Sequence, residues 1–165
     1  MTVQFEWPAD WPERIAGTSC DMCSNGGQDR NHYGARIYAG RFVDAYLQSA
    51  QIQRGYTLAI WNGRHVVEPT ELTDSEASGY WLETLRVAKA IIAFYRPMKL
   101  NYETLGNTSP HLHTHLLPRF EVDPRPGQPF PLLAQSGTES QIPEAEFLAD
   151  LDHLRQLTGY SASDS

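Results

Sequence analysis

One long helix, clearly bounded at both ends, constrains the fold of this chain more than any other feature. Residues 73–76 form a capping box, in which the Thr73 hydroxyl and the Glu76 carboxylate satisfy backbone N–H groups at a helix start. Pro97 lacks the N–H that a helix interior needs, so the helix ends before it. Apolar residues at steps of three and four predict one buried face, made of Trp81, Leu85, Ala88, Ile92 and Tyr95. Such a helix has to cover a sheet.

Strand-like segments lie on both sides of this helix. Runs of β-favouring residues, bounded by turn residues, predict strands at 35–39, 42–47, 55–61, 99–105 and 111–120. A single helix among strands supplies no alternating parallel units. We therefore expect an α+β fold, with a mostly antiparallel sheet of about five strands.

The length of 165 residues suits one domain with flanking segments. Residues 1–34 are expected to form an irregular arm, and residues 35–122 the central domain. Residues 123–165 begin with a proline-rich stretch, continue through a flexible linker at 135–141 and end in a C-terminal helix. The apolar face of that last helix would consist of Phe147, Leu151 and Leu154.

The charge and composition exclude several classes of function. A net charge of −7 with only two lysines argues against a nucleic acid polymer as partner, because phosphate backbones are bound by concentrated basic surface. A small phosphorylated metabolite is still compatible, since backbone N–H groups can hold phosphate. The sequence contains no apolar run of signal-peptide or membrane-spanning length, so we expect a cytoplasmic protein without a membrane partner.

Three histidines occupy alternate positions of the last predicted strand. Because successive strand side chains point to opposite faces, His111, His113 and His115 project together. Neighbours would lie about 6.6 Å apart, so one metal ion can take two of them but hardly all three. The remaining imidazole is available as nucleophile, proton donor or phosphate hydrogen-bond donor. A surface histidine run or a purely structural metal strand is the plainer alternative, but the polar glycine-containing loop just before the strand favours function.

The cysteine pair Cys20 and Cys23 adds a second candidate site. In a reducing compartment a CxxC spacing suggests metal binding or redox chemistry before a structural disulfide. A lone pair does not decide between these, because a tetrahedral zinc site needs two more ligands. His32 and His153 have no comparable context, and we assign them no role.

The segment His111-Leu112-His113-Thr114-His115-Leu116-Leu117 resembles the His-φ-His-φ-His-φφ signature of the histidine triad (HIT) superfamily, in which φ is hydrophobic and Thr114 fits least well. The resemblance covers about residues 35–120, with strand, helix and loop features in family order. It implies a HIT-like fold. It also implies that His113 attacks the α-phosphorus of a nucleotide to give a transient nucleotidyl-histidine, while His115 contacts the phosphate and leaving group.

The same resemblance implies where substrate would bind. The loop that resembles the family's phosphate-contacting segment consists of Gly106, Asn107, Thr108 and Ser109. Asn101 resembles a family position near the ribose and phosphates. Two positions depart from the family pattern: Gln48 replaces an acidic residue that holds the ribose hydroxyls, and Tyr56 replaces a histidine that often follows the strand-opening glycine. The sugar or base recognised is therefore expected to differ from the common one.

Zinc-containing HIT proteins also suggest how the cysteine pair is used. By that resemblance, Cys20, Cys23, His65 and His111 would hold one structural Zn²⁺, with all four positions taken by protein ligands. This set gives the first histidine of the triad to the metal and leaves His113 as the nucleophile.

The family resemblance implies an enzyme, either a hydrolase or a nucleotidyl transferase, acting on a dinucleoside polyphosphate or a nucleoside phosphoramidate. Alternatives are a non-catalytic zinc-stabilised nucleotide-binding module, a metal-dependent hydrolase with an open zinc, and a HIT-fold enzyme of specialised metabolism. A homodimer joined through the sheet region is also implied by the resemblance. The sequence does not separate the substrates.

Overall fold

The computed structural model describes residues 6–49, 52–123, 125–130 and 142–162. The strands are β1 (Arg30–Asn31), β2 (Gly34–Ala39), β3 (Val43–Leu47), β4 (Thr57–Trp61), β5 (Lys99–Glu103) and β6 (His113–Arg119). The helices are α1 (Trp11–Ile15), α2 (Asp21–Ser24), α3 (Asp74–Tyr95) and α4 (Glu144–Thr158), with a 3₁₀ turn at Pro69–Glu71. The linker expected at 135–141 lies outside the described residues.

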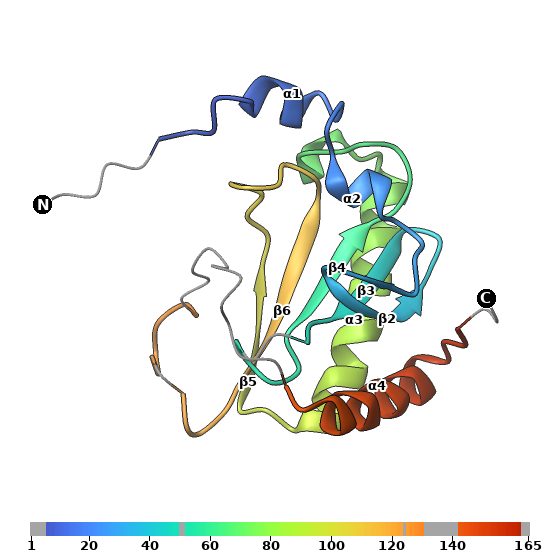
Figure 1. Cartoon of the computed structure of the whole chain (residues 1–165), viewed down its shortest axis with the longest axis vertical. Coiled ribbons are helices and arrows are strands. Elements are labelled where there is room, and N and C mark those ends of the chain that lie inside the picture. The colour runs from blue at the N-terminus through green and yellow to red at the C-terminus, as the bar shows by residue number, and fades with distance from the viewer. Residues whose placement is uncertain (1–5, 50–51, 124, 131–141, 163–165) are drawn as a thin grey trace, which may run out of the picture.

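The strands form one antiparallel sheet in the order β1-β2-β3-β4-β6-β5. This confirms the expected α+β fold, with a mostly antiparallel sheet, one long helix and a C-terminal helix (Figure 1). The sheet has six strands because the two-residue β1 extends it beyond β2. β6 lies between β4 and β5, so its side chains are supported by a strand on each side.

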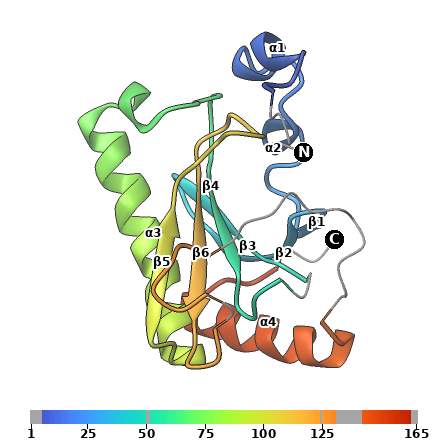
Figure 2. The same cartoon turned by 90° about the vertical axis from the view of Figure 1, so that its left-hand side faces the viewer.

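The long helix α3 covers one face of the sheet, as the view in Figure 2 shows. Its capping box is formed: the Thr73 N–H donates to the Glu76 carboxylate at 2.8 Å, and the Glu76 N–H donates to the Thr73 hydroxyl at 3.3 Å. The helix ends at Arg96, whose φ of 48° lies in the left-handed region, directly before Pro97. The sequence therefore placed both ends of this helix correctly.

The predicted buried face of α3 is wrong in part. Trp81, Leu85 and Ile92 are 40%, 41% and 44% exposed, whereas the neighbouring face is buried against the sheet. The buried residues of α3 are Tyr80, Thr84, Val87, Ala88, Ala90 and Ile91, of which only Ala88 belongs to the predicted face. Apolar residues occupy much of the helix circumference, so two overlapping faces share the same spacing and periodicity could not choose between them.

The C-terminal helix α4 packs against α3 and β2. Phe147, Leu151 and Leu154 are buried on its inner side, as expected from their spacing. Gly159 ends the helix with a φ of 75°, a left-handed conformation that glycine adopts without steric cost. Among the described residues, no helix combines the length and the apolar character needed to cross a bilayer.

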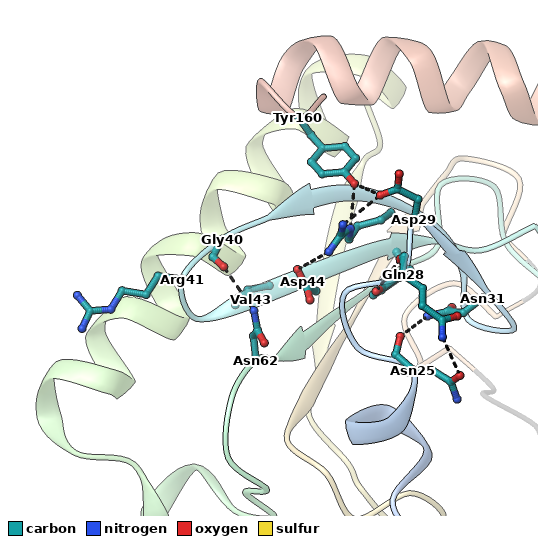
Figure 3. Close-up of polar contacts among 12 residues, drawn as sticks. Asn25, Gln28, Asp29, Asn31, Gly40, Arg41, Val43, Asp44, Asn62 and Tyr160 are labelled. Carbon is teal, nitrogen blue, oxygen red and sulfur yellow. Dashed lines mark hydrogen bonds and ion pairs between the residues drawn. The ribbon is translucent and has the colours of Figure 1, made fainter. Parts of the chain in front are cut away.

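The N-terminal arm is more ordered than expected. Pro12 stands near the start of α1, where its missing N–H costs nothing, and the Cys20 sulfur accepts a hydrogen bond from the Cys23 N–H at the start of α2. The segment after α2 is tied to the sheet by Arg36, which pairs with Asp29 at 3.0 Å. Tyr160, beyond the end of α4, also donates to Asp29 (Figure 3). These contacts bring the arm back onto the sheet.

Candidate functional site

The two faces of β6 carry different chemistry. Thr114 faces α3, where its hydroxyl lies 2.7 Å from that of Tyr80. His113 and His115 point to the opposite face, away from the helix. The alternation expected from strand geometry therefore places these two imidazoles on the face that α3 leaves uncovered. β6 begins two residues later than predicted, so His111 lies at the end of the preceding loop.

The ring of His113 is oriented by a hydrogen bond to a nearby backbone carbonyl. Its Nδ1 lies 2.6 Å from the His111 carbonyl oxygen. Because a carbonyl oxygen can only accept, Nδ1 carries the proton, and in a neutral ring Nε2 then presents a lone pair. His113 thus holds its Nε2 as an unprotonated nitrogen, which is the form a nucleophilic imidazole requires.

His115 lies between His113 and a tyrosine. Its Nε2 is 3.1 Å from the Nε2 of His113, and its Nδ1 is 2.7 Å from the Tyr56 hydroxyl. The rings of Tyr56 and His115 are close to parallel, with centroids 5.9 Å apart and an interplanar angle of 22°. Tyr56 lies directly before β4, and β4 pairs with β6.

Burial keeps both imidazoles uncharged near neutral pH. It lowers the pKa of His113, and it lowers the pKa of His115 to about 3, with a smaller contribution from His113 itself. The pKa of the Tyr56 hydroxyl is raised by burial, so this group stays protonated. The site therefore offers neutral donors and acceptors rather than fixed charges.

A cavity of about 450 Å³ opens beside these groups. It is lined by His113 and His115 and by residues of the arm, the strands and the loop before β6: Met22, His32, Tyr33, Gln48, Ile52, Tyr56, Leu58, Leu105, Gly106, Asn107, Thr108 and Ser109. The structure thus brings the expected loop residues and Gln48 to the two histidines. Gln48 is only 4% exposed, and within the described part of the chain its Nε2 has no hydrogen-bond partner.

The arm contributes to this cavity in ways that sequence reasoning missed. Met22, Tyr33 and His32 line it, although no role had been assigned to His32. Arg14 of α1 donates to the Thr108 carbonyl at 2.8 Å and so connects the arm to the loop. No local pattern marks these residues, because their position depends on how the arm folds back over the sheet.

Asn101 is the expected site residue that the structure does not bring to the cavity. Its Oδ1 accepts a hydrogen bond of 2.5 Å from Arg119. Both side chains line a separate groove along β5. Arg119 is also held by Asp123. A direct contact between Asn101 and a ligand beside His113 would require this network to open.

The four expected metal ligands converge at the other end of the histidine segment. The ligand atoms of Cys20, Cys23, His65 and His111 all lie within 4.8 Å of one another. His111 Nδ1 is 3.3 Å from the Cys20 sulfur and 3.4 Å from that of Cys23, and His65 Nδ1 is 3.5 Å from Cys23. Bond lengths of about 2.0 to 2.3 Å around a tetrahedral zinc separate its ligand atoms by about 3.3 to 3.8 Å, so the cluster suits a zinc site.

The other ring nitrogens of both histidines also fit metal binding. His111 Nε2 lies 2.9 Å from the Trp61 carbonyl, and His65 Nε2 lies 3.1 Å from the Ile15 carbonyl. Each Nε2 must carry the proton, since a carbonyl only accepts, and each Nδ1 is left with a lone pair facing the thiols. The backbone thereby orients both imidazoles for a metal.

The electrostatics of the cysteine pair argue against redox chemistry. Burial, followed by the neighbouring Cys20, raises the pKa of Cys23 to about 12. A redox-active cysteine needs the opposite shift, because the thiolate is the reactive form. A Zn²⁺ ion bound by these residues would supply the positive charge that stabilises thiolates.

Comparison with known proteins agrees with this geometry. Residues 30–122 match the HIT domain family. A Bacillus subtilis (strain 168) relative, Protein hit, is 32% identical over 91 residues, which cover 52% of this chain and 62% of the relative. The match therefore spans less than two thirds of that relative.

Solved structures show the same fold. A histidine triad protein from Bradyrhizobium japonicum superposes with a TM-score of 0.68 at 21% identity, covering 76% of this chain and 91% of its own. A zinc-bound histidine triad family protein from Mycobacterium smegmatis gives a TM-score of 0.60 at 22% identity, covering 86% of this chain and 94% of its own. Since the HIT domain match covers more than half of the 165 residues, the chain belongs to the HIT domain family.

Proposed function

We propose that this protein is a hydrolase or nucleotidyl transferase that cleaves its nucleotide substrate at the α-phosphate through a nucleotidyl intermediate on His113. The observation that carries this proposal is the 2.6 Å contact between His113 Nδ1 and the His111 carbonyl. It leaves an unprotonated Nε2 beside a cavity of about 450 Å³. A neutral imidazole in that tautomer is a competent nucleophile at neutral pH.

The surroundings of His113 suit a phosphoryl group. His115 and the loop 106–109 line the same cavity. Backbone N–H groups and short side-chain donors of this loop would face the negative charge that develops on the phosphoryl oxygens. His115 would donate to the phosphate or the leaving group. In the first step His113 Nε2 bonds to the phosphorus and the bond to the leaving group breaks; water or another acceptor then replaces the histidine.

Gln48 is proposed to contact the sugar. Its buried Nε2 needs a hydrogen-bond acceptor, and it lines the cavity. An amide can donate as well as accept, whereas the carboxylate of the family pattern only accepts. We therefore expect a bound ligand to present an acceptor oxygen at this point.

The zinc is proposed to be structural. Cys20, Cys23, His65 and His111 would fill all four tetrahedral positions and leave none open for water. Its role would be to hold the arm against the sheet. Arg14 would then connect the ordered arm to the loop through the Thr108 carbonyl.

The division of the chain into three parts and the cytoplasmic location stay predictions.

A substrate screen tests the proposed function. Purified protein is incubated with adenosine and guanosine phosphoramidates, dinucleoside polyphosphates and nucleotide sugars, with ribose and deoxyribose forms of each, and the products are separated by chromatography. We expect release of a nucleoside monophosphate from at least one class, because attack occurs at the α-phosphorus. The His113→Ala protein, prepared identically, is the blank for contaminating activity.

The outcomes separate the alternatives. Turnover by the wild-type protein and none by the blank supports the proposal. Tight nucleotide binding without turnover of any class would instead indicate a binding module. Equal turnover by both proteins would mean that none of the measured activity depends on His113, which would contradict the proposal.

We further propose that the protein forms a homodimer through β5. In the described part of the chain β5 pairs only with β6, so its other edge is free. Tyr102 on this strand is 38% exposed, and Met98 and Leu105 beside it are 77% and 51% exposed. A free edge with exposed apolar side chains is suited to pairing with a second copy.

Light scattering at tens of micromolar should therefore give twice the chain mass of 18.6 kDa. Tyr102→Glu should shift the mass toward the monomer, because a like charge would face itself across the interface. Leu82→Glu is the matched control, since Leu82 is 70% exposed on α3, away from β5. A monomeric wild-type mass at this concentration would contradict the dimer.

A further inference from the structure

Two hydrogen bonds link Tyr56 to the proposed nucleophile His113, and a third ties His113 to the His111 carbonyl. The Tyr56 hydroxyl lies 2.7 Å from His115 Nδ1, His115 Nε2 lies 3.1 Å from His113 Nε2, and His113 Nδ1 lies 2.6 Å from the His111 carbonyl. Tyr56 itself is only 3% exposed. The departure from the family pattern at this position therefore contacts His115, the histidine beside the proposed nucleophile.

The carbonyl at the end of this series of hydrogen bonds fixes the direction of every bond. His113 donates from Nδ1, so its Nε2 can only accept, and the hydrogen between the two histidines must belong to His115 Nε2. His115 Nδ1 then has a lone pair, and the Tyr56 hydroxyl must be the donor. This assignment uses neutral rings throughout, as expected for buried imidazoles.

We propose that Tyr56 is a positioning residue that holds His115 in the tautomer whose Nε2–H serves the reacting phosphate. The inference rests on the proposed function for its chemistry, but the tautomer itself is a property of the free protein. Tyr56 acts through His115 and needs no contact with substrate. Its hydroxyl keeps its proton throughout, because burial disfavours the phenolate.

The contribution of Tyr56 should be largest in the transition state. Before reaction, His115 is held both by Tyr56 and by the lone pair of His113. When His113 Nε2 bonds to phosphorus, that lone pair is no longer an acceptor, and the His115 N–H is released to a phosphoryl oxygen. Among the described residues, Tyr56 then still holds the His115 ring through its hydrogen bond to Nδ1. As the bond to His113 Nε2 forms, the bond from phosphorus to the leaving group breaks and the leaving group takes that electron pair. His115 donates a hydrogen bond and keeps its proton.

Substituting Tyr56→Phe removes the hydroxyl and keeps the ring. We expect kcat to fall by about 10- to 100-fold, by analogy with the loss found when the orienting partner of a metal-ligating histidine is removed. KM should change by no more than about threefold, because the lost interaction matters mainly in the transition state. Tyr56→His, which restores an N–H donor, should recover part of kcat.

Tyr80→Phe is the matched control. Tyr80 is also buried and its hydroxyl also contacts β6, but it meets Thr114 on the opposite face. The kcat of the Tyr80→Phe protein should stay within about twofold of the wild-type value. Wild-type kcat in Tyr56→Phe, or an equal loss in both variants, would overturn the positioning role.

Nitrogen-15 NMR of labelled histidine tests the tautomer without substrate. With resonances assigned by loss of signal in His115→Asn, wild-type His115 should show a protonated Nε2 and an unprotonated, hydrogen-bonded Nδ1. The Nδ1 resonance should move in Tyr56→Phe and stay in Tyr80→Phe. A protonated Nδ1 in the wild type, or no movement in Tyr56→Phe, would overturn the inference. If the substrate screen finds no turnover, the proposed function fails, while this measurement still decides the role of Tyr56.

Discussion

Replacing His113 by Ala should lower kcat by about 10⁴-fold or more, the scale of loss seen when an enzyme's nucleophile is removed. The fold and the metal content should be unaffected, because His113 is not among the four clustered ligands. The hydrogen bond from its side chain to the His111 carbonyl is lost at a cost of about 1 kcal/mol. Steady-state kinetics, a thermal melt and zinc analysis of the same preparation check the three parts.

A trapped adduct gives a sharper result for the same residue. With a substrate whose leaving group departs quickly, the intermediate should accumulate before hydrolysis. Mass spectrometry after an acid-free quench should find one nucleotidyl group on the peptide that carries His113. The His153→Ala variant is the control, since His153 is exposed on α4, and it should form the adduct at the wild-type rate. Full activity in His113→Ala without any adduct would make activated water the better account.

Disrupting the zinc cluster should have the largest effect on stability. Cys20→Ser, Cys23→Ser or His111→Ala should abolish the expected one zinc per chain. At a free zinc concentration about 1,000 times the Kd, binding contributes about 4 kcal/mol. Losing this contribution to the free energy of unfolding should lower Tm by about 10 °C in a protein of this size. Elemental analysis and calorimetry measure both quantities.

The structural effect of losing zinc should be concentrated in the arm. Limited proteolysis should cut the region of α1 and α2 first, because the metal ties Cys20 and Cys23 to residues far along the chain. Activity should fall with it, since Arg14 connects α1 to the loop at Thr108. The His153→Ala protein should keep its zinc, its Tm and its resistance to protease. A Cys20→Ser protein with wild-type zinc content and Tm would refute the cluster as a metal site.

The sequence alone determined the local geometry of this protein. The capping box at Thr73 and the stop at Pro97 set the ends of α3, because both act on neighbouring backbone groups. The alternation of histidines set the shared face of His113 and His115, because strand side chains repeat every two residues. These features depend on residues a few positions apart, so a local pattern is sufficient.

Tertiary structure decided which distant groups meet. Cys20 and His111 are separated by 91 positions, and only the family resemblance pointed to their pairing. Nothing local predicted that Met22 and Tyr33 would line the cavity, or that Arg119 would hold Asn101. The buried face of α3 was predicted wrongly in part, because two overlapping faces of the helix share the same spacing.

The tautomers of the histidines were decided by the fold as well. The His111 carbonyl fixes His113, and the Trp61 and Ile15 carbonyls fix His111 and His65. Histidine's identity specifies that one ring nitrogen can donate and the other accept, but not which one does. That choice follows from the acceptor each ring meets after folding, and it is what separates the proposed metal ligands from the proposed nucleophile.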